Sequence, residues 1–464
     1  MRKFDLIVIG SGSGLEVSSE ASDAGWSVAV VEEGPFGGTC LNRGCIPSKM
    51  LIHCADVMQT VQNASLFGIH ATVDRVDWPF IVHRAFEEVD ADAAMIERGN
   101  RQSPNIEVFK GRGRFTGPKT IEVTGPEIQG GKANGEQLTA DTILIAAGTR
   151  PWAPEIPGLE QTAYITSDEA LRLPEQPKRL TVVGGGYIAA ELAHFFGALG
   201  TEVTIIHRRG QMLREEDEEI ARRFTEVYQR RFNMVLEAHA TAISSRNGEI
   251  TVAVATPDGN QSITSDTLLM ATGRVPNTDI LDVAKAGVEL DQRGYVRTDE
   301  FLQTNVPGIW ALGDIVGRYL LKHSANLEAA YAANNILNPD NQAAVDYHAM
   351  PHAVFASPQV ASVGLTQQEA EGRGAAYVAA LYDYSDTAFG ASIEDKDGFV
   401  KVLADPESGE ILGCHIIGSD ASTLIQEAAN AMRLRLGVDA ITQSIYVHPA
   451  LPEVVQRAFG QLGL

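Results

Sequence analysis

The sequence predicts an α/β protein with two doubly wound dinucleotide-binding domains and a C-terminal α+β domain. Two glycine-rich loops, at residues 10–15 and 184–189, each follow an apolar strand and precede a helical pattern. Strands and helices alternate through both of these regions, which is typical of parallel sheets covered on both faces. Strand-like runs at 399–403 and 412–417, followed by helical stretches at 421–436 and 453–459, favour antiparallel strands with helices on one side.

Length and composition restrict the classes of function. A chain of 464 residues is expected to form roughly two to four domains. The net charge of -23 argues against a nucleic acid partner, whose phosphates require a basic face. The same charge suits an ordinary acidic cytosolic protein or adaptation to a salty cytoplasm. No apolar run approaches the length of a membrane span, and the N-terminus does not resemble a signal peptide, so a cytoplasmic location without membrane partners is expected.

The first glycine loop predicts a pyrophosphate site. The strand 4–9 leads into Gly10-Ser11-Gly12-Ser13-Gly14-Leu15, where glycines allow the backbone to approach a phosphate at a helix N-terminus. The next strand, 27–31, ends at Glu32, about 20 residues after the loop, where a carboxylate can hold ribose hydroxyls. Leu15 occupies the place of the usual third glycine, so Gly14 is the candidate for the close helix–strand packing.

The second loop predicts a second dinucleotide. The strand 179–183 precedes the pattern Gly-x-Gly-x-x-Ala, and the strand 202–206 ends without an acid. Arg208, Arg209 and Arg214 follow that strand instead. Basic residues at this place suit a 2′-phosphate and favour NADPH over NADH, although an exposed basic turn is the alternative.

Three further segments complete the predicted sheets. Apolar strands ending in the small-residue turns 146–149 and 271–274 would each close the sheet of one nucleotide domain. The strand before Asp314 ends in an acid, which suits either hydrogen bonds from a flavin ribityl chain or a helix N-cap.

The stretch Gly37-Gly38-Thr39-Cys40-Leu41-Asn42-Arg43-Gly44-Cys45-Ile46-Pro47-Ser48-Lys49 suggests redox chemistry. A cysteine pair in a cytoplasmic protein is more often catalytic or metal-binding than structural. No second pair or histidine cluster lies near Cys40 and Cys45, so no metal site is predicted. Cys54 and Cys414 are expected to be small buried residues.

These motifs, in this order and ending in His448-Pro449-Ala450-Leu451-Pro452-Glu453, resemble the flavoprotein disulfide reductase family over essentially the whole chain. The resemblance implies an FAD domain at 1–155 and 275–345, an NAD(P) domain at 156–274 and a dimer-interface domain at 346–464. The implied FAD-binding residues are Gly10, Gly12, Gly14, Glu32, Gly38, Thr39, Lys49, Gly148 and Asp314. The implied NADPH-binding residues are Gly184, Gly186, Ala189, Arg208, Arg209, Arg214 and Gly273.

The family also implies a chemistry. Hydride would pass from NADPH to FAD and then to a Cys40–Cys45 disulfide, with Cys45 facing the flavin and Cys40 attacking the substrate. Exchange requires a thiolate, so a base is needed. His448 is the candidate base, with Glu453 to orient it and stabilise its charged form.

The resemblance further implies that the base comes from the partner subunit, so that the homodimer shares its active sites. Lys49 and Glu191 match the family's ion pair near the flavin. The helix after Cys45 is expected to start near Pro47, which suits a first helical position. His323 lies either at the site or on a helix surface.

The substrate is less clearly indicated. The arginines favour reductases that use NADPH over NAD-dependent dihydrolipoamide dehydrogenase, although NADH remains open. The segments 320–326 and 447–455 are most similar to mycothione reductases, and bis-γ-glutamylcystine reductases are relatives of the same type. Dihydrolipoamide dehydrogenase is the alternative enzyme, and an accessory flavoprotein that serves a protein partner is the alternative of another class.

Overall fold

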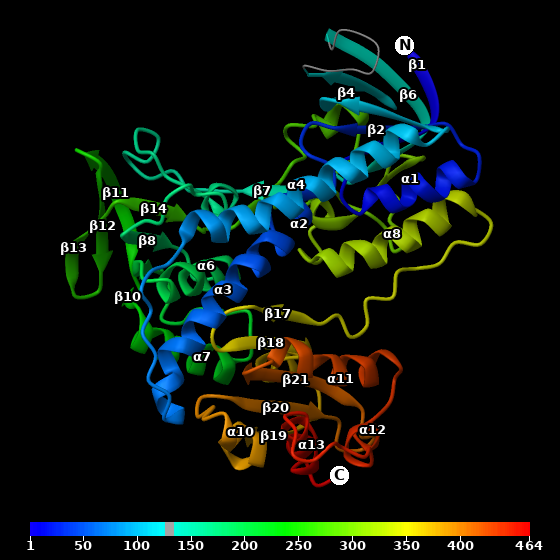
Figure 1. Cartoon of the computed structure of the whole chain (residues 1–464). Helices are drawn as coiled ribbons and strands as arrows, with labels where there is room; N and C mark the ends of the chain where they lie inside the picture. The colour runs from blue at the N-terminus through cyan, green and yellow to red at the C-terminus, as the bar shows by residue number, and fades with distance from the viewer. Residues whose placement is uncertain (126–133) are drawn as a thin grey trace. The chain divides into compact units, whose positions relative to one another are not determined.

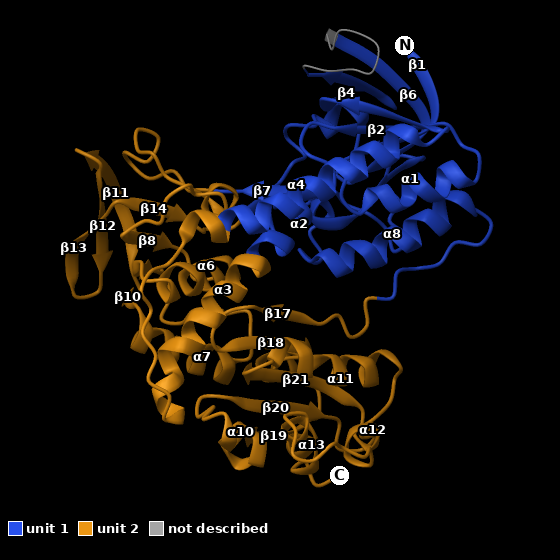
Figure 2. Cartoon of the chain, in the orientation of Figure 1, with its two compact units in different colours: residues 1–48, 82–152, 274–346 blue, residues 49–81, 153–273, 347–464 orange. Residues whose placement is uncertain are grey.

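The chain folds into two units, which Figure 2 shows in two colours. The structure is a computed structural model that describes residues 1–125 and 134–464. Unit 1 consists of residues 1–48, 82–152 and 274–346, and unit 2 consists of residues 49–81, 153–273 and 347–464. Among the described residues, no helix is both long and apolar enough to cross a membrane.

The described part of unit 1 is built on a seven-stranded sheet with the order β3-β2-β1-β6-β5-β4, in which β16 also pairs with β6 (Figure 1). Its parallel strands are β1 (Arg2–Ile9), β2 (Val28–Glu32), β3 (Ile106–Lys110), β6 (Asn134–Ile145) and β16 (Ile309–Ala311). Its antiparallel strands are β4 (Arg112–Gly117) and β5 (Thr120–Thr124).

The parallel strands β1 and β2 are buried on both faces, as expected for parallel strands, whereas residues of β4 alternate between buried and exposed. Alternate residues of β1 enter different cores: Ile7 and Ile9 pack with one cluster, and Leu6 and Val8 with the other. The second cluster also contains apolar residues of α1 (Gly14–Asp23) and α8 (Lys322–Leu337).

The sheet topology places a ligand site at the end of β1. β2 and β6 lie on opposite sides of β1, so the strand order changes direction there. Open α/β sheets bind ligands outside the carboxyl ends of the strands at such a point. The first glycine loop follows β1 directly and therefore lies at this edge.

The described part of unit 2 contains a parallel sheet with the order β10-β9-β8-β14 and an antiparallel sheet with the order β11-β12-β13. The parallel strands are β8 (Arg179–Val183), β9 (Glu202–Ile206), β10 (Asn233–Val235) and β14 (Thr267–Met270). The antiparallel strands are β11 (His239–Arg246), β12 (Glu249–Thr256) and β13 (Gly259–Ser265). The helices of this region include α6 (Tyr187–Ala198) and α7 (Glu218–Arg231).

The C-terminal part of unit 2 forms a five-stranded antiparallel sheet with the order β17-β18-β21-β20-β19. Its strands are β17 (His352–Val354), β18 (Gln359–Gly364), β19 (Val378–Asp383), β20 (Phe399–Ala404) and β21 (Ile411–Gly418). Residues of α11 (Ala421–Arg433) and α13 (Glu453–Gly460) share one apolar core with this sheet. The two parallel sheets and the C-terminal antiparallel sheet therefore confirm the predicted fold class.

Shorter or connecting elements complete the described chain. The helices are α2 (Gly38–Arg43), α3 (Cys45–Asn63), α4 (Trp78–Gln102), α5 (Ser167–Ala170), α9 (Gln367–Arg373), α10 (Ala388–Ser392) and α12 (Asp439–Thr442). The 3-10 helices are η1 (Ala64–Phe67), η2 (Val283–Ala286), η3 (Gly313–Val316) and η4 (Tyr384–Asp386), and the two short strands β7 (Thr149–Pro151) and β15 (Arg274–Pro276) pair with each other.

Three local expectations need correction. α3 begins at Cys45 rather than at Pro47. Pro47 still fits inside the first turn, because the first four N–H groups of a helix have no intrahelical acceptor. α11 ends at Arg433, earlier than the predicted 436. Cys54 is half-buried rather than buried, and its thiol donates to the Met50 carbonyl at 3.5 Å, whereas Cys414 is fully buried as predicted.

Candidate active site

The first glycine loop is packed so tightly that two of its glycines exclude any side chain. A Cβ on Gly10 would lie 2.4 Å from the Ala146 carbonyl oxygen, and Gly10 has a φ of +104°. A Cβ on Gly14 would lie 2.8 Å from the Ala146 side chain and 3.0 Å from that of Val8. Gly14 thus makes the close helix–strand contact that the sequence assigned to it in place of Leu15.

Glu32 lies at the mouth of this loop. Its Oε2 accepts hydrogen bonds from the Ser11 backbone N–H at 2.9 Å and from the Ser11 hydroxyl at 2.8 Å. Its Oε1 accepts from the Gly34 N–H at 2.7 Å. The carboxylate is therefore held beside the loop, where a ribose hydroxyl can reach it.

The loop leaves room for a phosphate group. A Cβ on Gly12 would meet one neighbouring atom within 4 Å, the Gly38 Cα at 3.9 Å, whereas a Cβ on Gly38 would lie 2.7 Å from the Gly12 Cα. Gly38 and Thr39 begin α2, so a second helix N-terminus faces the loop. These residues fit the pyrophosphate of FAD.

Asp314 is bound to the turn that follows β6. Its Oδ2 accepts from the Thr149 hydroxyl at 3.0 Å, and Arg274 Nε donates to the same hydroxyl at 2.8 Å. Burial raises the pKa of Asp314, while the Arg274 charge and the Thr149 hydrogen bond oppose that rise. Asp314 is the second residue of η3, whose N-cap is Leu312, so the alternative of a helix N-cap is wrong. The neighbouring Gly148 has a φ of +62° and open space where a Cβ would stand.

The two cysteines of the redox motif lie together in unit 1. Cys40 is half-buried in α2 and Cys45 is exposed at the start of α3, and both are present as cysteines rather than as a disulfide. The hydrogen bond with Cys45 raises the pKa of Cys40 strongly, burial and the charge of Cys45 raise it further, and the Lys322 ammonium opposes the rise. Cys40 consequently needs help to become a thiolate, which is the requirement that a base would meet.

Lys49 and Glu191 form a partly buried ion pair in unit 2. Lys49 Nζ lies 2.9 Å and 2.8 Å from the two carboxylate oxygens of Glu191, on α6. The Phe355 backbone N–H also donates to Glu191 Oε1 at 2.9 Å, and Lys49 Nζ lies 4.6 Å from the centre of the Phe355 ring. Phe355 is a member of this cluster that the sequence did not indicate, since its contribution is a backbone hydrogen bond and a ring face.

The second glycine loop is equally tight. Gly184 has a φ of +146°, and a Cβ there would lie 2.2 Å from the Ala271 carbonyl oxygen. A Cβ on Gly185 would collide with the His207 ring at 2.4 Å, but a Cβ on Gly186 would meet nothing within 4 Å. This open face at the N-terminus of α6 fits a second pyrophosphate.

The basic residues after β9 are accessible. Arg208, Arg209 and Arg214 are exposed, and Arg214 Nε lies 2.8 Å from Glu215 Oε1. His207 was not among the predicted site residues, yet its buried Nε2 has no hydrogen-bond partner among the described residues. Burial lowers the pKa of His207, and the three arginines lower it further. A neutral ring with an unsatisfied nitrogen beside the glycine loop fits a site that a nucleotide completes.

Two other predicted nucleotide contacts also belong to this region. Ala189 is fully buried in α6, so it provides the small contact that the third position of the pattern requires. Gly273 has a φ of +122°, and a Cβ there would meet nothing within 4 Å, so its turn leaves space for a ligand.

His448 and Glu453 form a hydrogen-bonded pair in unit 2. His448 Nδ1 lies 2.9 Å and 3.2 Å from the two oxygens of Glu453, and the Ala450 N–H donates to the same carboxylate at 3.1 Å. The His448 hydrogen bond lowers the pKa of Glu453, so the carboxylate stays charged. An acceptor at Nδ1 fixes the proton there and leaves Nε2 of a neutral ring as the basic nitrogen. The side chain of His448 is 70% exposed, whereas that of Glu453 is 10% exposed.

His323 lies exposed in the first turn of α8. Lys322, the residue before it, donates to the Ser13 hydroxyl at 2.8 Å, and Ser13 donates to Asn326 at 2.9 Å. In the part of the chain that the structure describes, no group of three histidine, cysteine, aspartate or glutamate side chains could hold a metal ion.

Comparisons with known proteins agree with this set of features. Residues 4–334 match the family described as "Pyridine nucleotide-disulphide oxidoreductase", and residues 350–459 match the dimerisation domain of the same family. Mycothione reductase of Mycobacterium tuberculosis is 40% identical over 469 aligned positions, covering 100% of both chains. Dihydrolipoyl dehydrogenase of Chlamydia muridarum is 34% identical, covering 97% of this chain and 95% of the relative.

Among solved structures, the Cu(II) complex of the HOCl-induced flavoprotein disulfide reductase RclA from Escherichia coli superposes with a TM-score of 0.87. The sequence identity to that protein is 27%, and the match covers 100% of both chains. The chain therefore belongs to the pyridine nucleotide-disulphide oxidoreductase family, as an enzyme that uses FAD and a pyridine nucleotide and carries the family's dimerisation domain.

Proposed function

We propose that this enzyme uses NADPH to reduce a low-molecular-weight thiol disulfide of the mycothione or bis-γ-glutamylcystine type. The observation that carries the cofactor preference is the pair Arg208 and Arg209, which are exposed after β9 and form no ion pair with a described residue. Guanidinium groups at this place suit a 2′-phosphate, whereas an acid there would suit NAD. The full-length identity of 40% to a mycothione reductase supports the substrate class.

The proposed reaction uses Cys40, Cys45 and His448. A flavin held beside these cysteines would pass on the electron pair of the pyridine nucleotide, and the Cys40–Cys45 disulfide would accept that pair and open to two cysteines. His448 takes the proton of the Cys40 thiol. The Cys40 thiolate then attacks one sulfur of the substrate, forms a mixed disulfide and releases a first thiolate, which the His448 imidazolium protonates. The Cys45 thiolate then attacks the Cys40 sulfur, which restores the Cys40–Cys45 disulfide and releases the second substrate thiolate, and that thiolate takes up a proton from solvent.

The remaining predicted site residues have supporting roles in this proposal. Lys49, held by Glu191, places a positive charge that can tune the flavin, and Glu453 orients His448 through the 2.9 Å hydrogen bond. Gly10, Gly12, Gly14, Glu32, Gly38, Thr39, Gly148 and Asp314 would hold FAD. Gly184, Gly186, Ala189, Arg214 and Gly273 would hold the pyridine nucleotide.

We further propose the domain organisation and assembly that the resemblance implies. FAD-binding segments at 1–155 and 275–345 would enclose an NAD(P) domain at 156–274, followed by an interface domain at 346–464. The match of residues 350–459 to the family's dimerisation domain supports a homodimer. In that dimer, His448 of one subunit would act as the base for the cysteines of the other. The acidic composition suits a cytoplasmic location.

A substrate survey tests the proposed function. The purified enzyme should turn over thiol disulfides of the two proposed types with NADPH, and should be slow with lipoamide and with glutathione disulfide. Rates would be measured spectrophotometrically with NADPH and NADH in parallel. Fast NAD-linked turnover of dihydrolipoamide without NADPH-linked disulfide reduction would instead support the dihydrolipoyl dehydrogenase function, which the 34% identity to such an enzyme keeps as the second candidate.

Neutral residues in place of Arg208 and Arg209 should change cofactor preference. Replacing both with Gln should raise the KM for NADPH by roughly 10- to 100-fold and leave that for NADH nearly unchanged, because each charge-assisted hydrogen bond to phosphate is lost. Arg246→Gln, which removes an exposed arginine from β11, is the matched control. An unchanged ratio of the two KM values would show that these arginines do not read the phosphate.

A further inference from the structure

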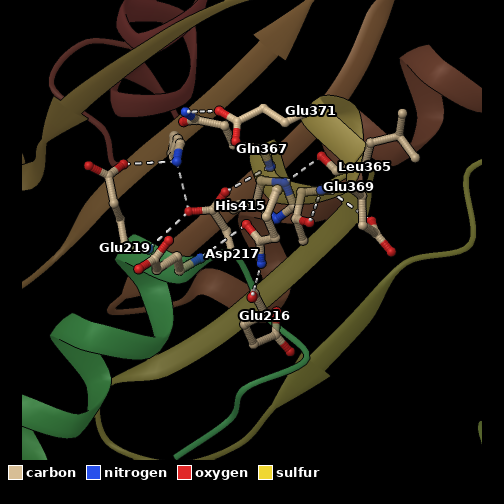
Figure 3. Close-up of polar contacts among 12 residues, drawn as sticks. Glu216, Asp217, Glu219, Leu365, Gln367, Glu369, Glu371 and His415 are labelled. Carbon is tan, nitrogen blue, oxygen red and sulfur yellow. Dashed lines mark hydrogen bonds and ion pairs between the residues drawn. The ribbon is translucent and has the colours of Figure 1, made fainter. Parts of the chain in front are cut away.

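A network of buried charges surrounds the start of α7 in unit 2 (Figure 3). Glu216 is 5% exposed, Asp217 is fully buried and Lys401 is 4% exposed. Buried charges are costly unless they are paired and fully hydrogen-bonded, so this arrangement must be specified by the surrounding structure.

Glu216 is held by two strands of the C-terminal sheet. Its Oε1 lies 2.8 Å from Nε2 of His352 on β17, and its Oε2 accepts from the hydroxyl of Ser362 on β18 at 2.7 Å. The backbone carbonyl of Glu216 accepts from the Gln368 side chain at 2.8 Å. Burial acts to raise the pKa of Glu216, but these partners, His352 above all, bring it below its ordinary value. The carboxylate therefore stays charged.

Asp217 is the N-cap of α7 and is held in the same way. It accepts from the Glu219 N–H at 3.1 Å, from Lys401 Nζ at 2.8 Å and from the Gln367 N–H at 3.0 Å. Lys401 also lies 2.9 Å from Glu219 Oε2, and Figure 3 shows Asp217, Glu219 and Gln367 together. Apart from the Glu219 N–H of α7, the described groups that bind the Glu216 and Asp217 carboxylates all belong to residues 350–459. This part of the chain matches the family's dimerisation domain.

The segment just before this network is tied to the second glycine loop. The Leu213 N–H donates to the Gly185 carbonyl at 2.8 Å, and Leu213 has a φ of +51°. A non-glycine residue in this left-handed region is uncommon, and it occurs where the surrounding contacts hold its backbone in that conformation. Arg214 follows Leu213 directly. It therefore lies between Leu213, which is bonded to the glycine loop, and Glu216, which is bonded to the C-terminal sheet.

We propose that the Glu216–Asp217 network is a positioning device for NADP(H), through which the C-terminal domain sets the place of Arg214 at the second glycine loop. Ser362, His352 and Lys401 are then positioning residues for cofactor discrimination, although none of them contacts the nucleotide. This inference rests on the proposed NADPH preference. A network that merely stabilised the fold would leave the ratio of NADP⁺ to NAD⁺ affinity unchanged.

Ser362→Ala is the mildest test, because it removes one hydrogen bond from Glu216 and leaves every charge in place. In the full-length, FAD-loaded enzyme, calorimetry should show the Kd of NADP⁺ raised roughly 3- to 10-fold and that of NAD⁺ raised by less than about 2-fold. Ser265→Ala is the matched control, since it removes a buried hydroxyl that bonds the Thr267 carbonyl at 2.9 Å elsewhere in unit 2. Equal ratios in the Ser362→Ala variant and the parent enzyme would overturn the inference.

Lys401 provides a second test with a conservative rescue. Lys401→Met should lower the NADP⁺/NAD⁺ affinity ratio further than Ser362→Ala, and Lys401→Arg should restore most of it, because arginine keeps the charge between Asp217 and Glu219. Thermal unfolding and flavin content identify variants that fold. If Lys401→Met does not fold, Ser362→Ala decides the question.

Arg214→Ala separates failure of the inference from failure of the proposed function. If Arg214 binds the 2′-phosphate, Arg214→Ala selectively lowers the affinity for NADP⁺. The double variant Arg214→Ala, Ser362→Ala then has nearly the same NADP⁺ affinity as Arg214→Ala alone. If Arg214→Ala leaves NADP⁺ binding unchanged, the phosphate role proposed for Arg214 is wrong. If Arg214→Ala weakens NADP⁺ binding but Ser362→Ala does not, only the positioning role proposed for the Glu216–Asp217 network is wrong.

Discussion

Replacing Cys40 with Ser is expected to lower the steady-state reduction of disulfides by at least about 1,000-fold, because the reaction loses its nucleophile. A serine hydroxyl is not ionised near neutral pH and cannot form the mixed disulfide. Rapid bleaching of the flavin by NADPH should persist, since that step precedes the attack on substrate. The two rates would be measured separately, by steady-state turnover of the disulfide and by stopped-flow absorbance of the flavin.

Cys54→Ser is the control for this variant. Cys54 is a half-buried thiol of α3 whose loss should leave both rates near those of the parent enzyme. Cys45→Ser provides the second comparison, because it keeps the nucleophile but removes the thiol that resolves the mixed disulfide. A single covalent adduct with the substrate thiol should then accumulate on Cys40. Sustained turnover by Cys40→Ser, or an adduct on the remaining cysteine of that variant, would reverse the roles assigned to the two thiols.

Local features of this chain were predictable because each depends on a few neighbouring residues. The strand 179–183 was predicted with the bounds that the structure shows for β8, since an apolar run bounded by a glycine turn leaves little choice. The packing role of Gly14 followed from the same reasoning, because a helix can approach a strand closely where no side chain intervenes. The family resemblance predicted the contacts Lys49–Glu191 and His448–Glu453. In the structure, the two residues of each pair lie within hydrogen-bonding distance.

Other features were not predictable because they join distant parts of the sequence. Asp217 is the N-cap of α7 in the structure, but its bond to Lys401 spans 184 positions. Nothing in the sequence around His207 indicates that its ring lies against Gly185. Phe355 joins the Lys49–Glu191 pair through its backbone N–H, which every residue except proline possesses. Tertiary packing, rather than residue type, selects these contacts.

Replacing His448 with Ala is expected to lower disulfide reduction by roughly 100- to 10,000-fold, the range typical of the loss of a general acid–base group. The half of the reaction that reduces the flavin should be spared. Glu453→Gln should have a smaller effect, because the amide keeps a hydrogen bond to Nδ1 but loses the charge that stabilises the imidazolium. His239→Ala, which removes an exposed histidine at the start of β11, is the control.

A mixture of two inactive variants tests whether the base comes from the partner subunit. When Cys40→Ser and His448→Ala chains are co-expressed with different tags, a hybrid dimer with shared sites contains one site with both defects and one site with neither. Purified hybrids should then show about half of the parent turnover per dimer, and a random mixture about a quarter. If each site is built from one chain, both sites of the hybrid carry one defect and no activity returns. The hybrid thus distinguishes a shared site from a self-contained one independently of the substrate, since any disulfide that the parent enzyme reduces reports the result.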